Sequence, residues 1–508
     1  MNKYHHPTVH LVGAGPGDPG LITLRGQSLL SDADVVLYDH LVAPELLLHC
    51  KATCEKIFVG KRVGKHTLSQ DKINALIIEK ANAYKQLVRL KGGDPYVFGR
   101  GAEEAQILKE AGITFEIVPG VTSGIAVPAY AGIPLTYRGI ASDACFITGH
   151  EQSDRTTGGS IDWHALAKWR GTIVFYMGVT HIKNITSRLL DGGKDGETPA
   201  AIISWGCTPK QKTVVSTLKN IAADALTQHI RPPAIIIIGK VVNMRQTLCT
   251  FESRPMFGTS IVVTRATSQA SSMVTKLMAL GSRVYQCPTI KTTPAKNIKP
   301  LYDAIENISK YQWLIFTSSN GVNFFFDALA KCKYDSRYLG NLKIAAVGIA
   351  TNNALKSYGI IADLVPRHFN AHNIIETLKS TTDLSNQNIL TPRANLADNE
   401  LPEGLAALGA HVDDITCYET EPDETNKSQI INHIENETVD WITFTSASTV
   451  NNFLKLVPHA IVNMHNIKIA TIGPKTSQAV RDAKLKVTLE AKGQTIDQLI
   501  DDIMAYKP

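Results

Sequence analysis

The chain opens with a strand-like run that ends in a loop made almost wholly of glycine and proline. Val9–Val12 is followed by Gly13-Ala-Gly-Pro-Gly-Asp-Pro-Gly20. Glycine has no Cβ, so the main chain of such a loop can approach a ligand closely, while proline fixes the loop's shape. A strand, a glycine-rich loop and a following helix form the usual site of a nucleotide-like ligand in an α/β sheet. The pattern favours an α/β fold with a ligand loop, and a tight turn without a ligand is the alternative.

The same loop formally matches the dinucleotide fingerprint Gly-x-Gly-x-x-Gly, and Asp39 ends the next strand about where a ribose-binding acid is expected. Pro16 and Pro19, however, each remove an amide donor from the loop. A pyrophosphate is held by such amides at a helix N-terminus, so the loop suits a ligand without phosphates. We therefore disfavour an NAD oxidoreductase, and the lack of a Gly-x-x-x-x-Gly-Lys-Ser/Thr pattern excludes a P-loop.

Strand-like runs alternate with helical patterns along the first half, as in parallel α/β sheets. The runs are Val9–Val12, Val35–Tyr38, Lys56–Val59, Gln86–Leu90, Phe115–Val118, Cys145–Thr148, Thr172–Tyr176, Ala200–Ser204 and Ala234–Ile238. Helical patterns between them include Gln70–Ala83 and Ala102–Ala111. Pro119-Gly120 interrupts this half, which predicts two lobes of about residues 1–119 and 120–245. The pattern lapses around Arg245–Phe257, and we expect a linker at 246–257 before a second domain at 258–508.

The second half contains an internal echo. Trp313-Leu-Ile-Phe-Thr-Ser318 returns as Trp441-Ile-Thr-Phe-Thr-Ser446, and Ile344-Ala-Ala-Val-Gly348 returns as Ile469-Ala-Thr-Ile-Gly473. The offset of about 125–128 residues is one α/β lobe rather than a short solenoid repeat. Two similar lobes that face each other form a cleft, which is a common ligand site.

Composition narrows the class of protein. The 508 residues are 44% hydrophobic and 19% charged, which indicates a globular protein of more than one domain. The net charge of +6 includes no block of Lys and Arg, so nucleic acid is not expected, whereas an acidic small substrate is compatible. The eight scattered cysteines form no metal-binding pattern and favour a reducing cytosol. No apolar run is long enough for a membrane span, and we expect a soluble, cytoplasmic protein.

The motifs of the first half, taken in order, resemble uroporphyrinogen-III C-methyltransferase. They are Gly13–Gly20, Tyr38-Asp39, Val59-Gly-Lys61-Arg62, Lys91-Gly-Gly-Asp-Pro95, Pro119-Gly-Val-Thr-Ser123, Ala129–Thr136, Thr148-Gly-His150 and Tyr176-Met-Gly178. The resemblance covers about residues 8–245 and implies the two-lobed tetrapyrrole-methylase fold, with S-adenosylmethionine (SAM) between the lobes and usually a homodimer. The sequence departs from the family at Ala102, Gly124 and Tyr137, and Tyr137 bears on substrate preference.

The resemblance also implies roles for particular residues. The cofactor-contact positions of the family are occupied by Pro16, Gly92, Gly93, Asp94, Val97, Thr122, Ser123, Met177 and Gly206. Asp39 and Lys61 match the proposed proton acceptor and donor. A carboxylate can take up the proton released on carbon methylation, although a residue such as Asp39 also serves as a helix cap. Lys61 is otherwise a surface charge or a contact to a substrate carboxylate.

The second half resembles uroporphyrinogen-III synthase over about residues 258–508. The match rests on Val263-Thr-Arg265, the two strand–Thr-Ser elements, the two glycine turns and Cys417-Tyr-Glu-Thr420. It implies two α/β lobes, one of about residues 258–290 with 419–508 and one of about 291–418, with no cofactor. Tyr418 stands at the family's tyrosine position and is the candidate acid for a departing hydroxide, with a structural tyrosine as the alternative. The candidate partners for substrate carboxylates are Arg265, Thr317, Ser318, Arg393, Ser446 and Lys475.

These resemblances predict a fused enzyme that cyclises hydroxymethylbilane to uroporphyrinogen III and methylates it twice with SAM to precorrin-2, for siroheme or cobalamin. The residues leave one alternative open, because strand-end hydroxyls followed by helix-start amides can bind carboxylates without any catalysis. On that alternative the second half is a carboxylate-binding or regulatory module on an active methyltransferase. Neither reading requires a metal.

Overall fold

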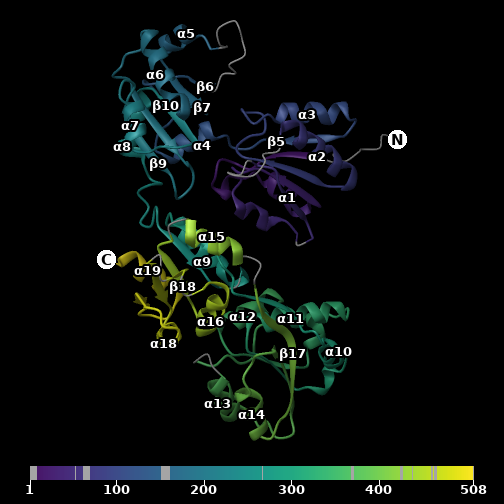
Figure 1. The fold of residues 1–508 in the computed structure, drawn as a ribbon. Coiled ribbons are helices and arrows are strands. Elements are labelled where there is room, and N and C mark those ends of the chain that lie inside the picture. Colours follow the sequence, from purple (N-terminus) through teal and green to yellow (C-terminus); the bar gives the residue numbers. More distant parts are fainter. Residues whose placement is uncertain are drawn as a thin grey trace. The chain divides into compact units, whose positions relative to one another are not determined.

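The structure is a computed structural model that describes residues 9–51, 53–60, 69–149, 161–265, 267–367, 371–423, 427–436, 439–458, 461–462 and 466–506. The chain divides into two compact units, residues 1–260 with 276–283 and residues 261–275 with 284–508. Two five-stranded sheets belong to the first half of the sequence and two to the second (Figure 1). The expected α/β class, with two lobes in each half, is therefore confirmed.

Sheet 1 is fully parallel and has the order β3-β2-β4-β1-β5. Its strands are β1 Val9–Gly13, β2 Val35–Tyr38, β3 Glu55–Phe58, β4 Leu87–Lys91 and β5 Phe115–Val118, and its helices are α1 Leu24–Asp32, α2 Gln70–Ala83 and α3 Gly101–Glu110. Short 3-10 turns, η1 Pro19–Leu21 and η2 Pro44–His49, follow β1 and β2. Because all five strands are parallel, the loops after them share one edge of the sheet.

Sheet 2 has the order β6-β7-β10-β8-β9 and is mixed. Its strands are β6 Ala144–Thr148, β7 Thr172–Tyr176, β8 Pro199–Ser204, β9 Lys212–Thr217 and β10 Ala234–Ile238. Its helices are α4 Ser123–Tyr130, α5 Trp163–Lys168, α6 Ile182–Asp191, α7 Ile221–Thr227 and α8 Arg245–Leu248, with η3 Val179–His181 and η4 Lys240–Met244. Only β6 and β7 pair in parallel, so the expectation of a parallel sheet is wrong here. The connection from β8 to β9 is too short for a parallel crossover, which needs a dozen or more residues.

Sheets 3 and 4 each have five strands but differ in strand order. Sheet 3 runs β12-β11-β18-β19-β20 and sheet 4 runs β13-β17-β16-β14-β15. The echoed strands β18 Trp441–Phe444 and β14 Trp313–Phe316 each lie between two parallel neighbours. β18 is the central strand of sheet 3, whereas β14 lies beside the edge strand of sheet 4. The other strands are β11 Ser260–Val263, β12 Arg283–Gln286, β13 Ile290–Pro294, β15 Lys343–Ala346, β16 Asn388–Ala394, β17 His411–Pro422, β19 Lys468–Thr471 and β20 Leu489–Glu490.

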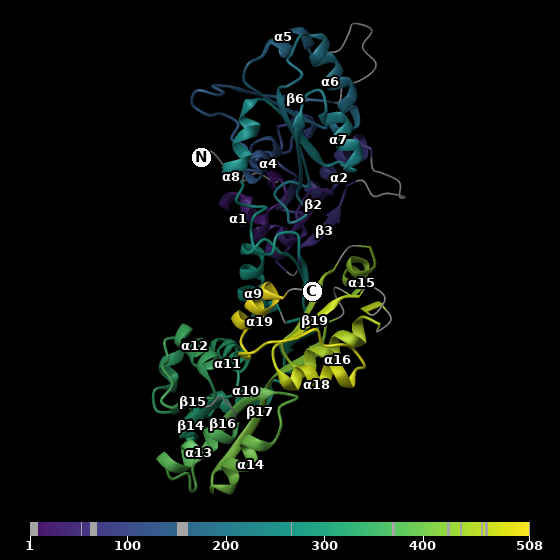
Figure 2. The same ribbon diagram turned by 90° about the vertical axis from the view of Figure 1, so that its left-hand side faces the viewer.

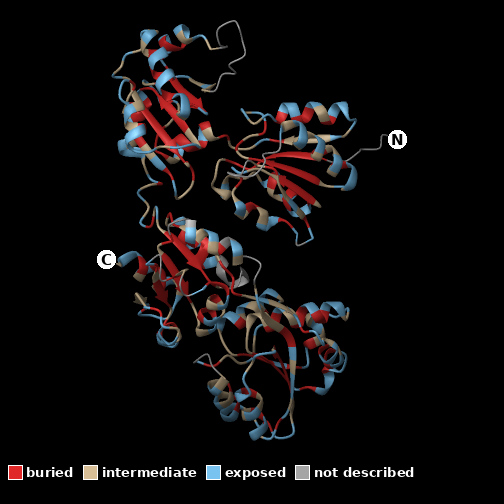
Figure 3. Ribbon diagram, in the orientation of Figure 1, coloured by how far each residue is buried: buried red, intermediate tan, exposed pale blue. Residues whose placement is uncertain are grey.

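Helices pack on both of these sheets (Figure 2). Those of sheet 3 are α9 Thr267–Ala279, α15 Lys427–Asn436, α16 Ala447–Leu456, α18 Pro474–Asp482 and α19 Ile496–Ala505. Those of sheet 4 are α10 Lys299–Glu306, α11 Ser319–Lys331, α12 Ile349–Ser357, α13 Ala371–Thr381 and α14 Glu400–Ala407, with η5 Ile308–Lys310 and η6 Ser336–Leu339. Buried residues concentrate on the strands of all four sheets (Figure 3), because strands covered by helices on both faces carry continuous apolar runs.

The segment that the sequence marked as a linker packs against the lobe of sheet 2. The Phe251 ring is buried and lies 4.7 Å from the ring of Tyr130. Glu252 accepts hydrogen bonds from Gln211 (2.7 Å), Thr213 (2.6 Å) and Arg245 (2.6 Å). These contacts hold the segment to the first unit. Among the described residues, no helix combines the length and the apolar character needed to cross a bilayer.

Candidate functional sites

Three glycines bring the loops after β1, β4 and β5 into direct backbone contact. A Cβ on Gly120 would lie 2.3 Å from the carbonyl oxygen of Gly93 and 2.7 Å from the Cα of Gly13. Gly15 and Gly93 also exchange two backbone hydrogen bonds, of 3.2 and 2.8 Å. The loops can meet this closely only because these positions carry no side chain. The three glycine-containing loops therefore converge at the carboxyl edge of sheet 1.

The Asp94 side chain links two of these loops by hydrogen bonds. Its Oδ1 accepts from the amides of Tyr96 (2.8 Å) and Val97 (3.2 Å), while Oδ2 accepts from the amide of Gly120 (3.0 Å). One carboxylate therefore joins the loop after β4 to the loop after β5. Gly92 lies beside the loop after β2, because a Cβ there would come 2.7 Å from the Cβ of Leu41.

Tyr176, at the end of β7, connects sheet 2 to this edge. Its hydroxyl lies 2.7 Å from Thr122 Oγ1 and accepts from the amide of Gly124 at 2.7 Å. Burial raises the pKa of the Tyr176 phenol, so the hydroxyl keeps its proton at neutral pH and can donate to Thr122. Thr122 stands at the N-cap of α4 but makes no capping bond through its side chain. Its hydroxyl contacts the hydroxyl of Tyr176 instead, and Ser123 begins the helix.

The loops after β7 and β8 complete the candidate methylase site. Met177 has a backbone φ of 54° and a side chain 51% exposed, and Trp205 and Cys207 on either side of Gly206 also have positive φ. A Cβ on Gly206 would lie 2.3 Å from Val127 Cγ1, and one on Gly17, next to Pro16, would lie 2.7 Å from Thr208 Cγ2. Strained backbone of this kind often marks functional sites.

Two further expected cofactor positions lie in the loops after β1 and β4. Pro16 is half-buried between Gly15 and Gly17, and Val97 packs on the apolar cluster that contains Tyr176 and Val127. The structure therefore brings all nine cofactor positions to loops or helix starts that adjoin the contact between sheets 1 and 2. The two lobes also meet through Tyr130, which donates to Asp18 at 2.7 Å.

Asp39 follows β2 at the same edge. Its Oδ1 accepts from the amide of Leu41 at 3.2 Å, so Asp39 stabilises its own turn and does not cap a helix, which was the alternative for this residue. Its Oδ2 lies 3.7 Å from Nη2 of Arg89, and the Asp39 side chain is 26% exposed. The position expected for the proton donor, Lys61, lies outside the described residues, as does His150.

In the second half, Ser318 and Tyr418 meet at the carboxyl edge of sheet 4. Ser318 caps α11 by accepting from the amide of Gly321 (3.0 Å), and its Oγ lies 3.2 Å from the Tyr418 hydroxyl. The Tyr418 ring is 7% exposed and stacks on Phe324 at 5.2 Å. Burial raises the pKa of the Tyr418 phenol, which keeps it in the acid form that a proton donor needs. Thr317, between β14 and Ser318, is half-buried.

Arg393 does not have the free guanidinium expected of a substrate contact. Its side chain is 5% exposed and forms an ion pair with Asp414 through two nitrogens. The remaining Nη1 donates to the carbonyl of Asp398 at 2.6 Å. We correct the expectation for this residue, because a guanidinium enclosed in this way holds β16 to β17 and has no face left for a ligand.

The remaining candidates lie at the carboxyl edge of sheet 3. Arg265 follows β11, Ser446 follows β18 and Lys475 lies in the first turn of α18, after β19. Burial lowers the pKa of Arg265, and Lys475 is exposed. Ser446 forms a capping box with Thr449 at the start of α16. These strands are parallel neighbours, so the three residues share one edge.

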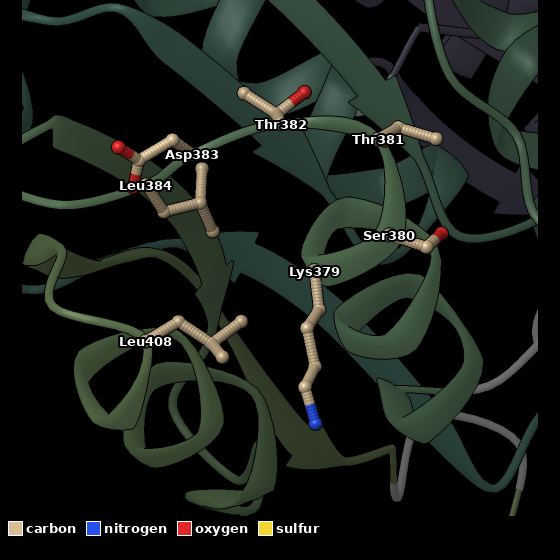
Figure 4. Close-up of a pocket in the computed structure, with 7 residues that line it drawn as sticks. All are labelled: Lys379, Ser380, Thr381, Thr382, Asp383, Leu384 and Leu408. Atoms are coloured by element: carbon tan, nitrogen blue, oxygen red, sulfur yellow. The ribbon is translucent and has the colours of Figure 1, made fainter.

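A pocket on the lobe of sheet 4 lies away from these candidates. It is formed by the C-terminal end of α13 and by Leu408, which follows α14 (Figure 4). Its lining residues are Lys379, Ser380, Thr381, Thr382, Asp383, Leu384 and Leu408. None of them follows a strand at the edge that carries Ser318. Within the described residues, no group of His, Cys, Asp and Glu side chains could hold a metal ion.

Sequence reasoning did not find two features of the first site. Tyr176 was noted only as part of a motif, and nothing in the sequence shows that its hydroxyl reaches across to Thr122. The buried group of Arg89, Lys91 and Glu104 was also missed. Its signal was present in charged residues placed within the strand Leu87–Lys91 and on the buried face of α3.

Two protein-family models match the chain in these regions. Tetrapyrrole (corrin/porphyrin) methylases match residues 8–222, and uroporphyrinogen-III synthase HemD matches residues 271–501. Fold and sites together define a tetrapyrrole methylase fused to a HemD-type synthase.

Similar proteins cover either the whole chain or about half of it. The porphyrin biosynthesis protein HemD of Ruminiclostridium josui is 39% identical over 499 residues, which cover 98% of each chain. The S-adenosyl-L-methionine-dependent uroporphyrinogen III methyltransferase of Methanosarcina barkeri is 48% identical over 47% of this chain and 94% of its own. The crystal structure of uroporphyrin-III C-methyl transferase from Thermus thermophilus complexed with S-adenyl homocysteine is 41% identical, covers 46% of this chain and 98% of that one, and has a TM-score of 0.40. The chain belongs to the enzyme family that joins a uroporphyrinogen-III C-methyltransferase to a uroporphyrinogen-III synthase within tetrapyrrole biosynthesis.

Proposed function

We propose that the chain catalyses two consecutive reactions. The second half cyclises hydroxymethylbilane to uroporphyrinogen III, and the first half methylates that product twice with SAM to give precorrin-2, a precursor of siroheme and cobalamin. The observation that carries the proposal is the meeting of the loops after β1, β4 and β5 at Gly13, Gly93 and Gly120, beside the contact between Thr122 and Tyr176. The similarity to a HemD protein along 98% of both chains supports the joint assignment.

The loops fit SAM by their shape and charge. Glycine has no side chain, so these loops leave their main chain exposed to a ligand. SAM carries no phosphate, so its site does not need the amides or lysines that bind phosphate. Arg100, on the loop after β4, is already paired with Glu103 at 2.6 Å. The residues that would hold SAM are the nine cofactor positions from Pro16 to Gly206 named above. When bound there, SAM supplies an electrophilic methyl group on its sulfonium.

The residues of this chain then orient the substrate and move a proton. Asp39 is the proposed proton acceptor, because its carboxylate lies at the edge where the loops meet and remains partly exposed. Lys61 is the proposed donor on the resemblance alone. We also propose, on the same resemblance, that the methyltransferase half forms a homodimer.

In the second half, Tyr418 is the proposed acid that protonates the hydroxyl leaving hydroxymethylbilane as water. The C–O bond breaks, the hydroxyl oxygen takes the phenolic proton, and ring closure releases a proton that returns the phenolate to phenol. The stacked Phe324 and the Ser318 hydroxyl fix the ring that carries this proton. Thr317, Ser318, Arg265, Ser446 and Lys475 are the proposed partners of substrate carboxylates, while Arg393 is a structural residue.

We propose domain boundaries on the same basis, with the methyltransferase at residues 1–245 and the synthase at 258–508. Residues 246–257 join them, although Phe251 and Glu252 pack on the first of the two. All eight cysteines are free thiols, which supports a reducing compartment such as the cytoplasm.

The test supplies freshly generated hydroxymethylbilane to the purified chain, with and without SAM, and separates the oxidised products by isomer and mass. We expect type III uroporphyrin without SAM and a dimethylated product with it. Formation of only the type I isomer without SAM would disprove the synthase assignment. If added uroporphyrinogen III were still methylated in that case, the methyltransferase assignment would stand and the second half would be a binding module.

A further inference from the structure

A closed group of charges lies directly behind Asp39. Arg89 and Lys91 project from β4 and Glu104 from α3, and their side chains are only 4%, 5% and 1% exposed. Glu104 Oε1 accepts from Arg89 Nε at 3.2 Å and from Lys91 Nζ at 2.9 Å. Charges this deeply buried are tolerated only when they are paired.

Arg89 is held on several sides. Its Nη1 donates to the carbonyl of Leu90 at 3.1 Å and reaches that of Leu37, in β2, at 3.5 Å. The Nε of Arg89 donates to Glu104, and its Nη2 lies 3.7 Å from Asp39 Oδ2. A planar guanidinium fixed by main chain and carboxylate has one orientation, so it presents a fixed positive charge to Asp39.

The group is neutral only when Asp39 is ionised. Two cations, Arg89 and Lys91, face two carboxylates, Glu104 and Asp39. Glu104 Oε1 accepts from both cations, while its Oε2 is buried and has no hydrogen-bond partner among the described residues. The single negative charge of Glu104 balances only one of the two positive charges. Burial, and then the charge of Arg89, lowers the pKa of the Lys91 amine, whereas a guanidinium keeps its charge in proteins. Arg89 is therefore the permanent counter-charge of the group.

We propose that Arg89 is a positioning residue for methyl transfer, which holds Asp39 as an oriented carboxylate while Glu104 holds Arg89 from behind. The inference rests on the proposed function, in which Asp39 accepts a proton. For each methyl transferred, the C–S bond of the sulfonium breaks, a C–C bond to the macrocycle forms, and one proton leaves the macrocycle for Asp39. A protonated Asp39 leaves the buried group with an unbalanced positive charge.

A double-mutant cycle tests this role. Arg89→Gln, Asp39→Asn and the double variant are compared with the wild type for kcat of methylation, for KM of SAM and of uroporphyrinogen III, and for thermal stability. We expect Arg89→Gln to lower kcat about 10- to 100-fold, as loss of an orienting partner does, with both KM values within about twofold. We expect no further loss when it is added to Asp39→Asn, because Arg89 acts through that carboxylate.

Two more variants separate positioning from folding. Arg89→Gln leaves Glu104 with one cation fewer, so Arg89→Gln/Glu104→Gln keeps the remaining charges balanced, and it should fold with the same low kcat. Arg89→Lys should recover part of the rate, and Arg25→Gln, at an exposed pair with Glu116, should match the wild type. Two results would overturn the inference without touching the proposed function, provided that the wild type methylates. One is a double variant of Arg89 and Asp39 whose loss of kcat is the product of the two single losses. The other is full activity of Arg89→Gln. A wild type that does not methylate would remove the proposed function and this role with it.

Discussion

Gly120 stands where three backbone segments leave no space for a side chain. A Cβ there would lie well inside contact distance of Gly93 and Gly13, and neither neighbour is a side chain that could turn away. We predict that Gly120→Ala loses about 1–3 kcal/mol of stability, as overpacked cores do. Its affinity for S-adenosylhomocysteine should fall at least about tenfold, or ~1.4 kcal/mol.

Calorimetric titration and chemical denaturation measure these two effects. Gly196→Ala is the matched control, because a Cβ there meets its nearest atom at an ordinary 3.4 Å. A Gly120→Ala variant that binds S-adenosylhomocysteine like the wild type would show that the contact of these loops does not shape the site.

Tyr418 carries a pH dependence with a defined sign. The raised folded-state pKa means that the folded phenol holds its proton to higher pH than the unfolded one, whose value is about 10. The stability from this group is complete below that value and is lost as pH rises through the folded pKa. We therefore predict that the unfolding free energy of Tyr418→Phe falls less steeply above about pH 10 than that of the wild type.

Denaturant titrations at a series of alkaline pH values measure this slope. Tyr334→Phe, at an exposed ring, is the control and should keep the wild-type slope. Equal slopes for Tyr418→Phe and the wild type would contradict the burial of an un-ionised phenol beside Ser318.

At this scale the sequence predicts the close packing of glycines but not the partners of charged or hydroxylated side chains. The motifs marked Gly93 and Gly120, because glycine after a strand allows positive φ or a close approach of main chain. Arg393 was expected to face a substrate, yet its partner Asp414 comes from the next strand, which a linear pattern does not reveal. The partner of the Thr122 hydroxyl was equally open, since a threonine that caps a helix and a threonine that contacts a distant side chain look the same in the sequence.

Among the elements, β16 and β17 depend on the buried pair of Arg393 and Asp414. Loss of one partner of a buried pair costs about 3–5 kcal/mol, and the one-third exposure of Asp414 reduces this. We predict that Arg393→Met lowers the unfolding free energy by about 2–3 kcal/mol while KM for hydroxymethylbilane stays within about twofold. Arg337→Met, at an exposed pair with Asp335, should leave both quantities unchanged.

Denaturation and steady-state cyclisation kinetics check this prediction. A large rise in KM with unchanged stability would restore Arg393 as a substrate contact and overturn its structural assignment.

Strand positions followed the apolar runs closely. Val35–Tyr38 and Phe115–Val118 match the prediction at both ends. The first is an inner strand of a parallel sheet, and strands of this kind are continuously apolar because both faces are buried. Lys212–Thr217 was missed, since this edge strand of sheet 2 contains only two apolar residues, Val214 and Val215. Strand direction was beyond the sequence pattern, which is why the antiparallel pairs of that sheet were not foreseen.

For the whole molecule, the two compact units predict separable unfolding. We expect differential scanning calorimetry to show two transitions, and S-adenosylhomocysteine to raise only the one that belongs to the first unit. A ligand at about 100 times its Kd adds ~2.7 kcal/mol to the state that binds it. Assignment of the transitions comes from Gly120→Ala, which should lower the ligand-sensitive one. A single transition that moves as a whole with ligand would show that the units unfold together.

The interleaved chain of sheets 3 and 4 sets an order for folding during synthesis. Sheet 4 lies within residues 290–422 and can close once that stretch has left the ribosome. Sheet 3 cannot, because Ile261 in β11 pairs with Trp441 in β18, far along the chain. The edge of β11 that pairs with β18 therefore stays unpaired until the last part of the polypeptide has been synthesised. A ribosome that stalls after residue 422 therefore yields a finished inner lobe and an exposed strand edge, which is the form most open to aggregation and to capture by chaperones.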